Sequence, residues 1–299
     1  MNLSLNNSKI ILIGIILIIL NTFSGSSFDT ITKFLSSASL MWYHYFALGN
    51  SFALLLLLIY LFFTSGIKKN IILKNKQSYF IPIIRGLIFI PIPITVYYAL
   101  SYIPLNIFTT ILMTTPFFVY VFSSLLLREK ITLKFWLIIV VGFLGTILVI
   151  KPNVSEANVI VFLVFLVALH NAFTNVVVSK YANIASAHGY SFYFILPLTL
   201  ISCFIFFIDP ISLTWSQLLL VCGGGLCMFL SIFFMTLAFH LAGKHSSIIS
   251  PFFFCQIIWA TIYGNFFFSE KLDILSIFGI ILIISSGTLT IMNTPKLIN

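Results

Sequence analysis

Long apolar runs, separated by short polar segments, recur from one end of the chain to the other. Each run is close to the roughly 20 residues that a helix needs to cross the hydrocarbon core of a bilayer. The runs are continuous and do not alternate apolar with polar residues, which favours helices over the strands of a membrane barrel. We therefore predict ten transmembrane helices, at about residues 9–28, 42–63, 80–101, 105–127, 133–151, 157–180, 188–209, 213–239, 246–268 and 273–292.

Short motifs recur at matching places in the two halves of the chain. Glu129-Lys130 precedes the fifth run, and Glu270-Lys271 precedes the tenth. Likewise, Lys33 closes the first predicted span and Lys180 closes the sixth. Both separations are close to half of the chain, which implies a repeated unit of five helices. Five is an odd number, so the second unit enters the membrane in the opposite orientation. We expect an all-α membrane protein with two inverted five-helix repeats, residues 1–151 and 152–299.

Composition supports a membrane protein and excludes several classes. Hydrophobic residues make up 61% of the 299 positions and charged residues only 7%, with a mean hydropathy of +1.17. Soluble domains carry roughly 25% charged residues. This composition excludes a soluble enzyme, a nucleic-acid-binding module and a disordered protein.

The net charge of +9 predicts an orientation. With ten helices, all Lys and Arg residues except Lys33, Lys151 and Lys271 fall on one side of the membrane. Positive residues gather on the cytoplasmic side, so both termini are expected there. This distribution explains the net positive charge, so no nucleic-acid partner is needed to account for it. The first run is followed by no convincing signal-peptidase site, so we expect it to be an uncleaved helix.

The chain offers no pattern for a metal or cofactor. Its four cysteines, Cys203, Cys222, Cys227 and Cys255, lie in apolar runs and none forms a C-x-x-C pair. We interpret them as small buried apolar residues. The histidines also lack the spacing of a metal site, so we expect neither a metal nor another cofactor.

Several motifs together resemble one transporter family. They are residues 29–35, Arg85-Gly86, Thr115-Pro116, Glu129-Lys130 and the block 251–273 that begins Pro-Phe-Phe-Phe-Cys-Gln. In order and spacing the chain resembles the drug/metabolite transporter superfamily, specifically the EamA-type ten-helix carriers. The resemblance implies five-plus-five inverted repeats, a central cavity built mainly by helices three, four, eight and nine, and transport of small organic metabolites or drugs. The chain departs from many relatives at Trp42–Tyr45, where an Arg is common, and at Phe254, where a Tyr is common.

One face of the ninth predicted helix has candidate binding residues. Phe252, Gln256, Trp259 and Tyr263 follow helical spacing. An amide in hydrocarbon is costly without a partner, so this face is expected to point into the protein. It is either a substrate wall or a packing face with one interhelical hydrogen bond. Polar residues of the fourth helix, Asn106 and Thr110, are its expected counterpart.

The third predicted helix has two further candidates, Arg85 and Tyr98. Arg85 lies about five residues inside the helix, where a charge is costly. It is either a substrate or gate residue, or a side chain that snorkels to the cytoplasmic surface. Pro91 and Pro93 remove two backbone donors from the same helix, which favours a kink.

Titratable groups inside the predicted helices are few. Asp29 could bind a cation, accept a proton, or pair with Lys33 one turn away. His44 and His170 are candidates for proton coupling or gating, or are packing residues with hydrogen bonds. Because buried acids are almost absent, we favour exchange or facilitated diffusion over proton symport. Gly223-Gly224-Gly225 in the eighth helix permits close packing or local unwinding.

These observations lead to a secondary active or facilitative transporter of a small organic metabolite. The expected cargo is an amino acid, an amine or an S-adenosylmethionine-like compound, moved by alternating access. The alternatives are an exporter of amphipathic drugs or metabolites, a non-transporting scaffold, and a lipid-modifying enzyme, which lacks the clustered polar residues that catalysis needs. We expect a monomer or homodimer in a bacterial inner membrane, with the lipid bilayer and a small molecule as its partners.

Overall fold

The computed structural model describes residues 2–36, 40–103, 105–130, 132–150, 158–268 and 274–293, and within these ranges the only regular structure is helical. Expectations that rest on Lys151, Glu270 and Lys271 lie outside the described residues. The helices are α1 (Asn2–Ser36), α2 (Trp42–Phe63), α3 (Ile67–Ile71), η1 (Lys76–Tyr79), α4 (Phe80–Phe89), α5 (Pro91–Tyr102), α6 (Leu105–Leu112), α7 (Thr115–Phe122), the π-helix η2 (Ser123–Leu127), α8 (Leu133–Ile150), α9 (Asn158–Lys180), α10 (Ala187–Ile208), α11 (Trp215–Ala242), η4 (Gly243–His245), α12 (Ser246–Ile249), η5 (Ser250–Phe254), α13 (Cys255–Phe268) and α14 (Ile274–Asn293).

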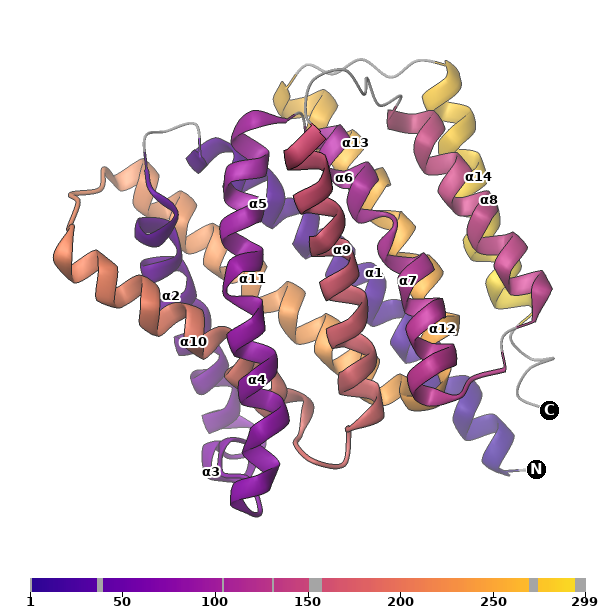
Figure 1. Ribbon diagram of the computed structural model, residues 1–299, viewed down its shortest axis with the longest axis horizontal. Helices are drawn as coiled ribbons and strands as arrows, with labels where there is room; N and C mark the ends of the chain where they lie inside the picture. Colours follow the sequence, from indigo (N-terminus) through magenta and orange to yellow (C-terminus); the bar gives the residue numbers. More distant parts are fainter. Residues whose placement is uncertain are drawn as a thin grey trace.

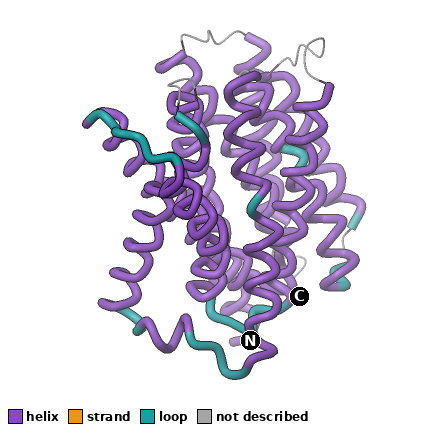
Figure 2. The backbone as a smooth tube through the Cα atoms, turned by 60° about the vertical axis from the view of Figure 1, so that its left-hand side comes forward, coloured by secondary structure: helices purple, strands orange, loops and turns teal. Residues whose placement is uncertain are grey.

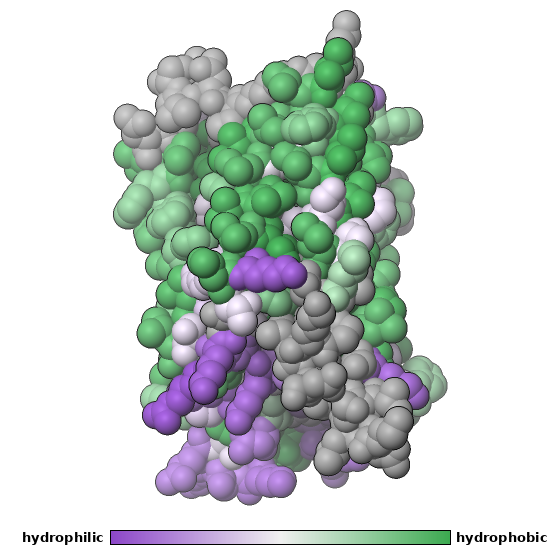
Figure 3. Space-filling model, turned by 90° about the vertical axis from the view of Figure 1, so that its right-hand side faces the viewer, coloured by the Kyte–Doolittle hydropathy of each residue, from purple (hydrophilic) through white to green (hydrophobic). Residues whose placement is uncertain are grey.

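The long helices pack side by side, and most run between the same two ends of the molecule (Figure 1). The first residues of α1 and the last residues of α14 lie at the same end, the lower end of Figures 1 and 2. The short helix α3 also lies at this end (Figure 1). Figure 3 shows hydrophobic residues over most of one face, with hydrophilic residues gathered towards the lower end. This is the surface of a protein that crosses a membrane.

Six stretches of the described chain are long and apolar enough to cross a membrane, which confirms a multi-pass membrane protein. They are Lys9–Ser36, Trp42–Phe63, Lys76–Tyr102, Val159–Lys180, Ala187–Ile208 and Trp215–Phe268. The last has 54 residues, and α11 ends within it at Ala242, because the φ of 52° at the next residue, Gly243, leaves the helical region. Three shorter apolar helices, Thr115–Leu127, Leu133–Gly145 and Ile277–Leu289, fall in the fourth, fifth and tenth predicted runs.

The first helix is longer than its predicted run, because α1 continues to Ser36. Its second half contains buried polar residues, among them Asn21, Ser26 and Asp29. α1 packs along α11, and the Asn21 amide donates to the carbonyl and hydroxyl oxygens of Ser231, both at 2.9 Å. Asn21 and Asp29 therefore find polar partners inside the protein, on α11 and α13, where an apolar lipid surface would offer none.

The helix is interrupted where the prolines predict a kink. α4 ends at Phe89 and α5 begins at Pro91, with Ile90 in a turn between them. A proline in the first turn of a helix replaces a donor that would have no partner, and it prevents the preceding helix from continuing. Thr115 and Pro116 begin α7 in the same way after α6 ends at Leu112.

Two glycines allow helices to approach at backbone distance. A Cβ on Gly86 of α4 would collide with the carbonyl oxygen of Tyr193 in α10. A Cβ on Gly225 of α11 would collide with the carbonyl oxygen of Gly49 in α2. By contrast, a Cβ on Gly223 would meet only the Ile31 side chain, at 3.8 Å. Gly225 therefore has a packing role, as expected of a glycine at a membrane helix crossing.

This difference predicts the result of two alanine substitutions in the same helix. Gly225→Ala forces α2 and α11 apart, and overpacking of this kind lowers the free energy of unfolding by about 1–3 kcal/mol. Gly223→Ala is the matched control and is expected to leave stability near that of the wild type. Thermal unfolding of the detergent-purified variants measures both. Equal midpoints for the two variants would contradict the packing role.

Candidate functional site

A cavity of about 140 Å³ lies between helices from both halves of the chain. It is lined from α1, α4, α5, α6, α9, α10, α11 and α13 and from the start of α7 and the end of η5. Its walls are mostly apolar, with a small number of polar side chains. The lining residues are Asn21, Gly25, Phe28, Asp29, Phe89, Ile92, Pro93, Val96, Phe108, Leu112, Met113, Thr115, Val167, Asn171, Asn175, Phe194, Met228, Ser231, Ile232, Met235, Phe253 and Gln256.

The strongest polar contact in this cavity joins α1 to α13. The Gln256 amide Nε2 donates to Asp29 Oδ2 at 3.0 Å. Asp29 is only 6% exposed, so its carboxylate meets bulk water hardly at all. A buried carboxylate held by one amide donor keeps spare acceptor capacity, which a cationic or donor group in the cavity could use.

Amide and hydroxyl groups extend the polar surface. Asn21 and Ser231 are joined by the hydrogen bond already described. Asn175 is almost fully buried, and its Nδ2 donates to the sulfur of Met235 at 3.3 Å. Its Oδ1 has no hydrogen-bond partner among the described residues. The cavity therefore offers a second acceptor as well as the Asp29 carboxylate.

Aromatic rings form much of the remaining wall. Phe28, Phe108 and Phe253 line the cavity, and so does the pair Phe89 and Phe194, whose rings stack with centroids 3.8 Å apart. Aromatic faces attract organic cations through the ring quadrupole, and they bury flat apolar groups. A carboxylate, amide acceptors and aromatic walls together suit a small organic compound that has a positive group.

Of the four residues expected on one face of the ninth helix, only Gln256 lines the cavity. Phe252 lies in η5, a 3₁₀-helix, where it is buried close to Gly287 of α14. Phe253 lines the cavity instead. A 3₁₀-helix has 3.0 residues per turn, so the expected register of 3.6 residues does not hold from Phe252 to Gln256.

Trp259 and Tyr263 pack against α1, outside the cavity lining. The Trp259 ring meets Phe23 edge-on, with centroids 5.1 Å apart. The Tyr263 hydroxyl is 2.7 Å from the Ser27 hydroxyl. These contacts fit the packing interpretation of this face, with its interhelical hydrogen bond, while Gln256 fits the interpretation as a binding wall.

The other expected site residues lie in different surroundings. Tyr98 of α5 is 42% exposed and is not part of the cavity lining. The side chains of Asn106 and Thr110 lie outside the described residues, although both positions belong to α6. Their neighbour Thr115 lines the cavity. Arg85 is 2% exposed, so it does not snorkel to the surface.

The two candidate histidines, His44 and His170, lie in different parts of the protein. His44 Nε2 lies 2.9 Å from the carbonyl oxygen of Asp209 and 3.7 Å from its carboxylate, which also accepts from the Tyr43 hydroxyl. This cluster joins the start of α2 to the end of α10, away from the cavity. His170 lies beside the cavity, because its ring is 6.3 Å from that of Phe89 and the next residue, Asn171, lines the wall.

Some lining residues were not foreseen. Phe28, Phe89, Phe194 and Phe253 look like any other apolar residue of a membrane helix, so the sequence has no signal that separates them from core or lipid-facing positions. Asn21 and Ser231 have a weak signal, since each is a polar residue within an apolar helix.

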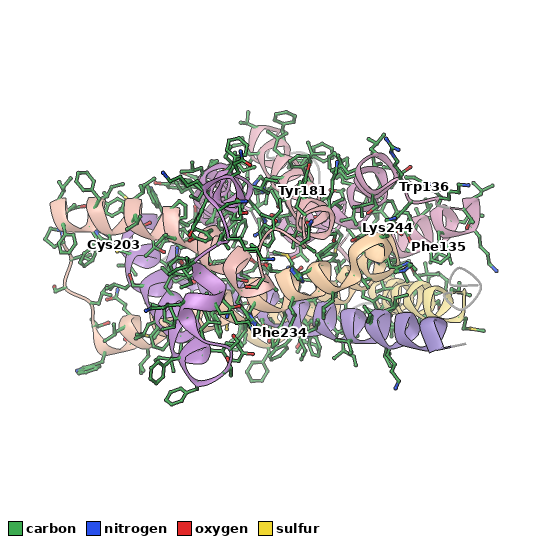
Figure 4. The ribbon with its side chains drawn as sticks, turned by 90° about the horizontal axis from the view of Figure 1, so that it is seen from below. Phe135, Trp136, Tyr181, Cys203, Phe234 and Lys244 are labelled. Carbon is green, nitrogen blue, oxygen red and sulfur yellow. The ribbon has the colours of Figure 1, made fainter. Side chains whose placement is uncertain are left out.

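A second pocket lies where the chain passes from η2 to α8 and from η4 to α12. It has a volume of about 380 Å³ and is lined by Leu127, Arg128, Glu129, Lys130, Thr132, Phe135, Lys244, His245, Ser247 and Ile248. Figure 4 shows Lys244 and Phe135 on the same side of the molecule, seen from below. The Glu129 carboxylate accepts hydrogen bonds from the Ser247 hydroxyl and from the backbone N–H groups of Ser246 and Ser247. Burial raises its pKa to about 7.

The described part of the chain contains no group of three or more metal-ligating side chains. The four cysteines are free thiols and are half-buried, so they are less buried than expected. Each lies on a helix face that is partly open, which the apolar run alone does not reveal.

Comparisons with known proteins agree on the type of protein. Residues 12–151 match the EamA-like transporter family. The S-adenosylmethionine uptake transporter of Rickettsia conorii is 24% identical over 298 residues, covering 97% of this chain and 96% of that protein. The pseudopaline exporter CntI of Pseudomonas aeruginosa is 27% identical over 281 residues, covering 91% and 93%. A solved crystal structure at 14% identity has a TM-score of 0.74 over 94% of this chain and 97% of that one, so the two share a fold.

The contact between Gln256 and Asp29 predicts a stability effect. Gln256→Leu leaves the buried carboxylate without its amide donor, which lowers the free energy of unfolding by about 1–3 kcal/mol. Tyr263→Phe, two turns away on the same helix, removes only the hydrogen bond to Ser27 and should have a smaller effect. Thermal unfolding in detergent compares the two. A larger loss for Tyr263→Phe would contradict the importance of the Asp29 contact.

Glu129 predicts a pH dependence of stability. Its pKa is raised in the folded protein, so the folded state binds more protons than the unfolded state between the ordinary carboxyl pKa and about 7. Stability therefore falls as pH rises through this window. Glu129→Gln should lose this pH dependence. Burial lowers the pKa of His245, which therefore adds its own pH dependence. Because both proteins contain His245, subtracting one stability curve from the other removes that contribution. Unfolding midpoints measured between about pH 5 and pH 8 test this, and parallel curves would contradict it.

Proposed function

We propose that this chain, whose residues 12–151 match the EamA-like transporter family, carries a small organic metabolite across the membrane by alternating access. The proposed cargo class is an amino acid, an amine or an S-adenosylmethionine-like compound. The cavity that contains the Asp29–Gln256 pair is the proposed binding site.

The helix contacts support two equivalent halves, residues 1–151 and 152–299. If the ten predicted runs are numbered in order, most of the main helix contacts between the halves have a counterpart when the halves are exchanged. α1 packs on α11 as α9 packs on α5, and α2 packs on α11 as α10 packs on α4. α2 packs on α10, and α8 on α14, as pairs that are their own counterparts. The Gly86 and Gly225 crossings obey the same exchange.

This exchange is the contact pattern of a two-fold axis. With five membrane crossings in each half, the second half is inserted opposite to the first, so the axis lies in the membrane plane. We propose ten crossings in two inverted repeats on this basis. Such a protein has two equivalent arrangements of its halves, one open to each side, around a site between them.

The chemistry of the cavity lining is the main support for the proposed cargo. It lies between the two proposed repeats and combines a buried carboxylate with aromatic walls. A charged group buried in a membrane protein marks a binding or transport site by default. The relatives whose names give a substrate move S-adenosylmethionine and pseudopaline. A small organic compound with a positive group fits both the cavity and these relatives.

Orientation and location follow from the charges. The basic residues of α3, η1 and η4, with Arg128 and Lys130 just after η2, lie in the connecting segments of one side, which we propose to be cytoplasmic together with both termini. Bacterial relatives favour the inner membrane. Because one of these relatives is an exporter, export is the second candidate direction of transport, after uptake.

Radiolabelled S-adenosylmethionine in proteoliposomes tests the proposal. The wild type is expected to take it up, and Asp29→Asn should reduce initial uptake about tenfold or more, because a charge-assisted contact of roughly 1.5–3 kcal/mol is lost. Ser27→Ala is the control, since Ser27 lies two residues away and bonds to Tyr263 outside the cavity lining. Equal loss of uptake in both variants, or unchanged uptake in Asp29→Asn, would contradict the assignment of the cavity as the binding site.

A further inference from the structure

Arg85 of α4 is a buried cation without an anion. Its side chain is 2% exposed. One Nη1 donates to the carbonyl oxygen of Tyr190 at a long 3.5 Å, and Cζ lies 3.9 Å from the centre of the Phe194 ring. Nε and Nη2 have no hydrogen-bond partner within the described ranges.

This state is costly for a guanidinium. The group has five N–H donors and is never neutral in a protein. A buried charge is normally paired, and one inside a membrane protein is costlier than one in a soluble core. In the part of the chain that the structure describes, no carboxylate forms an ion pair with Arg85. The ring of Phe194 and one carbonyl oxygen supply only part of the missing interaction.

Arg85 lies directly behind the cavity wall. Phe194, which covers the guanidinium, lines the cavity, and so does Phe89, one helical turn after Arg85 on α4. The two rings stack on each other at 3.8 Å. His170 stands next to Phe89, and both of its ring nitrogens are hidden from solvent. The Phe89–Phe194 pair therefore lies at the cavity wall on the side of the unpaired charge.

We propose that Arg85 binds a carboxylate of the transported compound, which enters when the Phe89 and Phe194 rings move apart. The planar fork of a guanidinium matches a carboxylate with two parallel hydrogen bonds. One positive charge balances one carboxylate, whereas a phosphate monoester would bring up to two negative charges. Asp29 lies on α1 and Arg85 on α4, on separate parts of the site, so the cargo is a zwitterion with a cationic and an anionic group. This inference rests on the proposed function.

A matched pair of compounds tests the carboxylate. S-adenosylmethionine and its decarboxylated analogue keep the same sulfonium, adenosine and amino groups and differ in the carboxylate. We expect wild-type proteoliposomes to prefer S-adenosylmethionine about tenfold or more in initial rate. Arg85→Gln should lose this preference while it still transports the analogue. Arg85→Lys keeps the charge without the fork and should retain an intermediate preference.

A second measurement does not depend on the cargo. Removal of an unpaired buried charge relieves its desolvation, so purified Arg85→Met without substrate should unfold at the same temperature as the wild type or higher. A structural Arg85, by contrast, would make Arg85→Met unfold several degrees lower. That lower midpoint overturns the inference whatever the transport result.

The outcomes separate the inference from the proposed function. If the wild type transports both compounds equally well, the carboxylate site is wrong and the transporter assignment stands. If the wild type transports neither compound, the proposed cargo class fails, and a lower midpoint of Arg85→Met then removes the anion site as well. If Arg85→Gln changes transport of both compounds by the same factor, Arg85 acts on the protein and does not recognise the carboxylate.

Discussion

The fold depends on one constraint, that polar groups within a bilayer must find their partners inside the protein. α1 shows this constraint most clearly, because its second half has buried Asn, Ser, Thr and Asp side chains within an otherwise apolar helix. Short hydroxyl side chains return their hydrogen bonds to the backbone one turn earlier, as Thr30 does to Ser26. The longer Asn21 and Asp29 instead reach other helices, α11 and α13. The position of α1 between these helices, and hence the cavity beside it, follows from these contacts.

Close backbone packing is the second condition, since apolar helices in lipid gain no hydrophobic energy by meeting each other. Gly86 and Gly225 remove a side chain where α4 meets α10 and where α11 meets α2. The helices that border the cavity are interrupted at Ile90 and before Thr115. Tight contacts at the crossings and breaks near the cavity divide the molecule into stiff pairs with a hinge-like region between them, which suits two arrangements of the same helices.

The sequence predicts those features that depend on local chemistry. Apolar runs predict helices and Pro91 predicts the interruption at Ile90, since each follows from a few neighbouring residues. Features that depend on distant residues are not predictable in this way. The sequence gives no sign that Phe194 covers Arg85, because the two are far apart along the chain. The 3₁₀ geometry of η5, which puts Phe253 in place of Phe252, also depends on the packing around Pro251. Gln256 was identified because an amide in an apolar helix is informative by itself.

Asp29 and Arg85 are both buried and do not pair with each other. Unpaired buried charges lower the stability of a protein with one fixed structure, but a carrier can use them to bind its cargo. Two opposite charges that met would form a stable closed state, and a compound would then have to break their contact. Charges kept apart by aromatic rings leave the empty protein at higher free energy, and a cargo with complementary groups lowers it. Such a cargo stabilises whichever arrangement of the halves brings its groups to both charges. The spacing of the charges therefore selects the compound by the separation of its own charged groups, and the rings between them select its apolar part.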